Sequence, residues 1–120
     1  MSTIKVDTIK TTSNVEVFTC KAWVNFDGTT NTGGTCTIRA SGNVTSVTDH
    51  STGSYTINFT TAMPDANYSF IASSGSSSAN ATSSTNATAA PTTTSCKMRT
   101  YTSTGSAYID PEYVSVAIFR

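Results

Sequence analysis

The chain of 120 residues contains no leucine and no glutamine, and few of its residues are lysine. These three residue types are among the best helix formers, so their absence or scarcity argues against helices. Serine and threonine together account for 43 residues. Threonine, like valine, tyrosine and phenylalanine, favours β-strands. The composition therefore predicts an all-β protein.

Charged residues are also scarce. Seven basic and seven acidic side chains are scattered singly and give a formal net charge of zero. A chain without a basic stripe has little with which to neutralise nucleic-acid phosphates or bind an anionic membrane surface. No apolar run approaches the roughly 18 residues of a membrane span, and the N-terminus lacks the apolar run of a signal peptide. We expect no nucleic-acid partner, no membrane insertion and synthesis in a cytoplasm.

Metal- or thiol-based sites have few residues to draw on. The three cysteines, Cys20, Cys36 and Cys96, include no Cys-x-x-Cys pair, and the single histidine, His50, has no cysteine at ligand spacing. The pattern favours three buried free thiols in a reducing compartment, with a disulfide between two of them as the alternative. Neither a metal nor a cofactor is expected.

The residues that are present alternate in the way strands require. In the segment KAWVNFDG, residues 21–28, Trp23 points to one face and Val24 and Phe26 to the other. Both faces are apolar, which predicts a core strand with a neighbour on each side. Comparable alternation recurs along the chain with turn clusters between. The pattern predicts about eight strands in an antiparallel β-sandwich or flattened barrel over residues 20–120.

Residues 1–19 form a predicted arm in front of this domain. Ile4 and Val6 alternate with polar residues, and Ile9 follows. So short a segment cannot bury its apolar face alone. It must lie on the domain as an edge strand, pair with a copy of itself, or dock on another protein. Ile4, Val6 and Ile9 are therefore the candidates for docking.

The last predicted strand, residues 113–119, is apolar on both faces. Such a strand is central in its sheet or lies at an interface. Its candidates for contacts between copies of the chain are Val114, Val116 and Ile118. The tyrosines beside turns late in the chain are candidates for exposed contact with a partner: Tyr101, Tyr108 and Tyr113.

Two sets of residues invite a catalytic interpretation. His50 follows Asp49 in a serine-rich chain, but no strand-turn-helix elbow frames a serine nucleophile. Asp110 and Glu112 are two apart, which suits paired carboxylates, yet Asp-Pro is also a common turn opener. We therefore expect a solvated loop histidine, two structural acids, no catalytic residues and no enzyme.

Several blocks of the chain together resemble a domain of tail-fibre-like virion proteins of marine bacteriophages and cyanophages. Residues 4–9 look like openings seen in such proteins, and the domain-like blocks cover most of residues 20–120. The blocks are IKVDTI (4–9), KAWVNFDG (21–28), IRASGNVTSVTD (38–49), GSYTINFTTAMPDANY (53–68) and VSVAIF (114–119).

The resemblance implies a non-enzymatic virion component, most often a homotrimer, that presents loops to a glycan or protein of the host surface. It leaves three hypotheses. The first is a tail-associated fibre or knob held on the particle by its N-terminal arm. The second is a head fibre or capsid decoration protein with the same fold. The third is a hydrolase of surface polysaccharide, which would need Asp110 and Glu112 paired in a groove.

Overall fold

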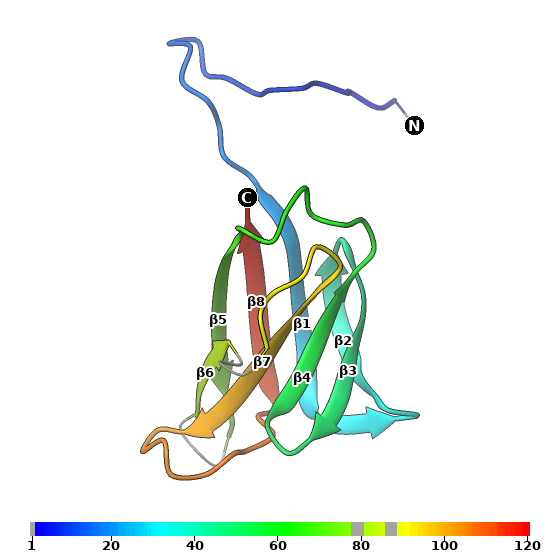
Figure 1. Ribbon diagram of the computed structural model, residues 1–120, viewed down its shortest axis with the longest axis vertical. Coiled ribbons are helices and arrows are strands. Elements are labelled where there is room, and N and C mark those ends of the chain that lie inside the picture. The colour runs from blue at the N-terminus through cyan, green and yellow to red at the C-terminus, as the bar shows by residue number, and fades with distance from the viewer. Residues whose placement is uncertain (1, 78–80, 86–88) are drawn as a thin grey trace.

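The computed structural model describes residues 2–77, 81–85 and 89–120 (Figure 1). This part of the chain holds eight strands and no helix, which confirms the all-β prediction. It accordingly contains no helix long and apolar enough to cross a membrane. The strands are β1 (Cys20–Thr32), β2 (Thr35–Gly42), β3 (Val44–Ser51), β4 (Ser54–Phe59), β5 (Ser69–Gly75), β6 (Ala81–Thr85), β7 (Ser95–Thr102) and β8 (Tyr113–Phe119).

The strands make one antiparallel sheet in the order β5-β8-β1-β2-β3-β4-β7-β6. The sheet folds over between β2 and β3, which pair at Thr35 and Thr48 and are joined through Asn43 at a φ of 56°. As a result β5, β8, β1 and β2 form one layer, and β3, β4, β7 and β6 form the layer facing it (Figure 1). The two end strands, β5 and β6, come close together, so the sheet is nearly closed. The predicted sandwich or flattened barrel is confirmed.

The core lies between the two layers. One layer contributes Phe26 and its neighbours on β1, and the other contributes Tyr55 and Ile57 of β4. The Phe26 and Tyr55 rings meet edge to face with centroids 5.2 Å apart. Each fully buried aliphatic or aromatic side chain of this kind stabilises the fold by about 1.5–3 kcal/mol. The alternation read from the sequence therefore places the right residues inside on these strands.

Strand β1 differs from the prediction in the exposure of its second face. Ala22, Val24 and Phe26 are buried, but Trp23 is 44% exposed. In a two-layer sandwich only one face of each strand points inward, so the other face of β1 meets solvent. Trp23 pairs with Gly42 of β2, and its indole lies against the space that a side chain at Gly42 would fill. Trp23 is therefore a surface residue with one covered side.

The burial of the three cysteines also differs from the predicted set of three buried thiols. All are free thiols, but Cys20 is exposed, whereas Cys36 and Cys96 are buried. Burial is the first cause that raises the pKa of Cys36 to about 12, and nearby carboxylates, Asp49 foremost, add to it. Burial likewise raises the pKa of Cys96 to about 12. Both buried thiols therefore stay protonated at neutral pH.

Thiol labelling tests this division, because the thiolate is the reactive form and must be reachable. We expect 5,5′-dithiobis(2-nitrobenzoate) at pH 8 to modify Cys20 quickly in the folded protein. Cys36 and Cys96 should react only after denaturation. In a Cys20→Ser variant the fast reaction should disappear. Rapid native labelling of either buried thiol would contradict the packing of β2 or β7.

Candidate functional site

The N-terminal arm projects from one end of the sandwich and is not part of the sheet (Figure 1). The docking candidates Ile4, Val6 and Ile9 are exposed, Ile4 to 88%. Three further apolar side chains of the arm share this exposure: Val15 and Val17, which alternate with Glu16 in the sequence, and Phe18. The sequence left three placements open for the arm. In the structure the arm is not an edge strand of the domain.

The arm has a local structure of its own. Lys10 and Glu16 form an antiparallel bridge, and the Val17 N–H donates to the Ile9 carbonyl at 2.7 Å. Asn14 adopts a φ of 63° in the turn between them. Asparagine tolerates this left-handed conformation better than most residues, which suits it to the turn. Residues 9–17 therefore form a small hairpin that displays apolar side chains without burying them.

A second apolar surface crosses the outside of the sandwich. Trp23 of β1, Ala117 of β8 and Ile71 of β5 occupy one register row across three neighbouring strands. We call these three residues the outer apolar row. Trp23 and Ile71 are exposed, and a shallow hollow of about 170 Å³ lies along β5 and β8 beside Ile71 and Ala117. Phe119, two residues after Ala117 in β8, is also exposed.

The three residues of β8 that were predicted to contact a second copy face inward instead. Val114, Val116 and Ile118 are buried in the chain's own core. Their burial leaves the opposite face of β8, which carries Ala117 and Phe119, as the face available to a second copy. The cause is again the two-layer architecture, in which the more continuous apolar face of a strand turns inward.

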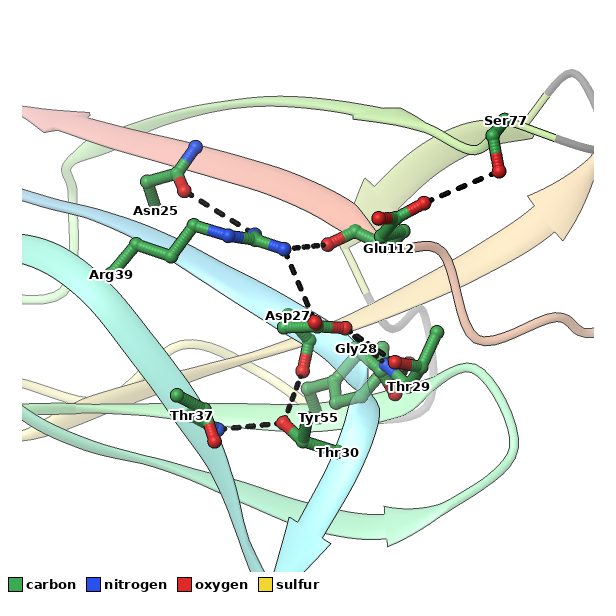
Figure 2. Close-up of polar contacts among 10 residues, drawn as sticks. All are labelled: Asn25, Asp27, Gly28, Thr29, Thr30, Thr37, Arg39, Tyr55, Ser77 and Glu112. Carbon is green, nitrogen blue, oxygen red and sulfur yellow. Dashed lines mark hydrogen bonds and ion pairs between the residues drawn. The ribbon is translucent and has the colours of Figure 1, made fainter.

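Arg39 organises the polar end of the same outer surface (Figure 2). A β-bulge opposite Asn25 and Phe26 inserts Arg39 as an extra residue in β2 and turns its side chain outward. Its guanidinium pairs with the Asp27 carboxylate at 3.2 Å and donates to the Glu112 carbonyl at 2.8 Å. It thereby ties β1 and β2 to the segment that enters β8.

Asn25 and Tyr113 also contact Arg39, and Thr29 contacts its partner Asp27. The guanidinium carbon lies 4.8 Å from the centre of the Tyr113 ring, so Tyr113, an exposed-contact candidate, is held by a cation–π contact. The pKa of Asp27 is lowered, first by a hydrogen bond from the Thr29 hydroxyl and also by the Thr29 N–H and the charge of Arg39. Asp27 therefore stays ionised and its charge is matched within the chain.

The other two candidate tyrosines lie together. Tyr101 and Tyr108 form an isolated bridge, and their rings are 4.9 Å apart at an angle of 38°. Tyr108 is 47% exposed and Tyr101 half-buried. Arg99, a residue that sequence patterns did not indicate, lies with its guanidinium carbon 4.7 Å from the centre of the Tyr108 ring.

The candidate acids Asp110 and Glu112 accept hydrogen bonds from different neighbours. Asp110 Oδ1 accepts hydrogen bonds from the Tyr55 hydroxyl and the Gly53 N–H, each at 2.7 Å. Glu112 Oε2 accepts from the Ser77 hydroxyl at 3.3 Å. Burial, followed by the hydrogen bond to Asp110, raises the pKa of Tyr55, so its hydroxyl remains a donor. Asp110 thus fastens the segment before β8 to the turn before β4.

His50 and the buried thiols do not gather into a reactive or metal-binding cluster. The His50 Nε2 atom is 2.8 Å from the Thr56 hydroxyl, and the neighbouring Asp49 accepts from the Asn31 amide at 3.0 Å. Among the residues with described placement, no group of three histidine, cysteine, aspartate or glutamate side chains could hold a metal ion. Asp49 and His50 lie in β3, so the predicted loop position of His50 is wrong, and both residues contact other strands.

The last residue is fixed to the loop before β5. Arg120 donates to both carboxylate oxygens of Asp65, at 2.9 and 2.6 Å. This pairing, followed by the Asn67 N–H, lowers the pKa of Asp65 from 3.8 to about 2. A lowered pKa means that the contribution to stability is present above pH 3.8 and is lost as the pH falls toward 2.

An NMR titration of the Asp65 carboxyl carbon tests this pair. We expect a midpoint near 2 in the native chain. The Arg120→Ala variant should move the midpoint back toward 3.8, the ordinary value for an aspartate. A native midpoint already near 3.8 would show that the C-terminal pair does not persist in solution.

Comparisons with models of protein families, with curated proteins and with solved structures find no significant match to this chain. Its candidate surfaces are therefore interpreted from their own geometry and chemistry.

Proposed function

We propose that the chain is a non-enzymatic structural component of a bacteriophage virion: a tail-associated fibre or knob that contacts the host surface and is held on the particle by its N-terminal arm. The observation that carries the proposal is the arm itself. Six apolar side chains of the arm are exposed on a segment that projects from an otherwise closed sandwich. The sequence blocks that resemble tail-fibre-like proteins supply the kind of particle.

The size of the arm suits a docking role. Its six exposed apolar side chains, with Ile4 88% and Phe18 79% exposed, are open to contact with a partner protein. Leaving such a surface in water is unfavourable. Inserted into a groove of another protein, its alternating side chains would be buried while backbone groups pair with a strand edge.

The particle-bound form is a homotrimer with the outer apolar row turned toward the shared axis. The row supports this arrangement because it spans three adjacent strands and because the nearby charges of Arg39 and Asp27 are already paired. Arg39 and Asp27 therefore bring no unpaired charge to a contact between copies. The arms of a cyclic trimer all leave at the same end, as attachment to one particle requires.

Removal of the arm tests the docking role. We expect deletion of residues 2–10 to lower incorporation into particles at least tenfold, measured by quantitative immunoblotting of purified virions. The melting temperature of the sandwich should change by no more than a few degrees, because the arm is outside the sheet.

A matched pair of variants separates apolar contact from a general effect of charge. Ile4→Asp with Val6→Asp should reduce incorporation nearly as much as the deletion, since two of the three docking candidates are lost. Thr3→Asp with Thr8→Asp adds the same charge and keeps Ile4, Val6 and Ile9, so it should incorporate within about threefold of the native chain. Normal incorporation of the truncated chain would refute docking through the arm.

A further inference from the structure

The hairpin after β7 holds the Tyr108 ring in a fixed position, and we call this supported ring the Tyr108 platform. Arg99 lies over the ring at 4.7 Å, and the Tyr101 ring is beside it at 4.9 Å. Both of these supporting side chains come from β7. Nearly half of the surface of Tyr108 remains open to solvent. An aromatic ring that is supported by its neighbours and still partly exposed can pack against an apolar surface of a ligand.

The platform is already in place without a ligand. The Thr102 N–H donates to the Ala107 carbonyl at 2.9 Å, and the Gly105 N–H donates to the Thr102 carbonyl at 2.8 Å. The bridge between Tyr101 and Tyr108 closes the base of this short hairpin. Because these contacts fix the backbone on both sides of the ring, little ordering is left for binding, which favours affinity.

The surroundings of the platform suit a polyhydroxylated ring. A hollow of about 200 Å³ lies between the tyrosines and the hairpin tip, lined by Tyr101, Tyr108 and residues 105–107. Ser106 lines the hollow, and its hydroxyl and those of Thr102 and Thr104 hydrogen-bond to one another at 2.6–3.4 Å, a cluster that we call the hydroxyl rim. Exposed hydroxyls of this kind can exchange these bonds for bonds to a ligand. Such a site combines an apolar face with donors and acceptors at its edge.

The position of the hairpin agrees with a role in contact with the host. The arm leaves the sandwich at one end, and the hairpin after β7 lies at the opposite end (Figure 1). If the arm is bound to the particle, as the proposed function requires, the Tyr108 platform is the part that faces outward.

We propose that the Tyr108 platform and its hydroxyl rim bind a pyranose ring of a surface glycan. The C–H face of the sugar packs against the exposed part of the Tyr108 ring, and the sugar hydroxyls replace the contacts among Thr102, Thr104 and Ser106. The inference rests on the proposed function for its biological setting, but the binding itself does not depend on the particle.

Binding can be measured on the isolated full chain by NMR. The probes are the methyl glycosides of glucose, galactose, mannose and N-acetylglucosamine, each at 10 mM. We expect at least one to shift the amide signals of Tyr101, Ser106 and Tyr108. Tyr108→Ala should weaken that binding at least tenfold, whereas Tyr108→Phe, which keeps the ring, should bind within threefold of the native chain.

Tyr113→Ala is the matched control, because it removes an exposed tyrosine of similar setting, stacked on Arg39. It should leave binding unchanged. The site is refuted if none of the four glycosides shifts these signals, or if Tyr108→Ala binds as well as the native chain. A chain present in virions but without glycoside binding overturns this site alone. A chain that binds glycosides but is missing from virions overturns the proposed function alone.

Discussion

Val116→Asp is expected to lower the free energy of unfolding by about 4 kcal/mol or more. Val116 is 3% exposed and lies between Val24 of β1 and Ala72 of β5, so a carboxylate there would have no partner. Burying an unpaired acid costs about 4 kcal/mol or more, whether it stays ionised or takes up a proton. A domain of this length has a total stability of about 6–15 kcal/mol, so one substitution removes much of it. Urea unfolding followed by circular dichroism measures the loss.

Two further variants keep this result interpretable. Val116→Ala should lower the free energy of unfolding by about 2 kcal/mol, which leaves a folded protein to measure if the aspartate variant does not fold. Thr45→Asp places the same acid on the exposed face of β3, where it can still accept from the Thr60 hydroxyl, and should cost less than about 1 kcal/mol. Native stability of Val116→Asp would show that this face of β8 is not core.

Gly53→Ala is expected to cost about 3–5 kcal/mol, an unusually large effect for one added methyl group. Gly53 has a φ of 65°, which side-chain-bearing residues rarely adopt. A Cβ there would lie 2.6 Å from the Thr100 carbonyl oxygen and 3.0 Å from that of Ile109. Both obstacles are backbone atoms, so they cannot move aside without disturbing the hydrogen bond from the Gly53 N–H to Asp110.

Gly33→Ala is the matched control for Gly53→Ala. Gly33 has a φ of 62° but no atom within 4 Å of an added Cβ. It should therefore cost only the conformational term of about 1–2 kcal/mol. Urea unfolding gives the free energy of unfolding of each variant. The difference between the two values reports how closely β7 and the segment before β8 approach the turn before β4. Equal costs would mean that this approach is looser than the structure has it.

Alternation was enough to predict most of the strands, because each strand of a two-layer sandwich has one buried face, but it did not indicate β6, whose sequence ATSST contains no large apolar residue. It could not predict which layer covers which face. Trp23 and Ile71 therefore face solvent, although apolar residues at strand positions are expected to be core. Val114, Val116 and Ile118 form the more continuous apolar face of β8, but the pattern left open whether that face meets the chain's own core or a second copy.

The candidate site could be predicted only in part for the same reason. The exposure of Ile4, Val6 and Ile9 follows from a short amphipathic segment with little else to cover it. The Tyr108 platform does not follow from the sequence, because it depends on a turn that brings Tyr108 back over Arg99. Similarly, Arg39 reaches Tyr113 only because a bulge re-aims its side chain.

The central claim, a virion protein held by its arm, is tested most directly by locating the chain on purified particles with cryo-electron microscopy. The account predicts density for the sandwich at the tail, in three copies around an axis, with the arm inserted into a neighbouring protein and the Tyr108 hairpin pointing away from the particle. Density over the capsid would make the chain a decoration protein or head fibre and would contradict the tail assignment. Absence from the particle would contradict the virion role itself.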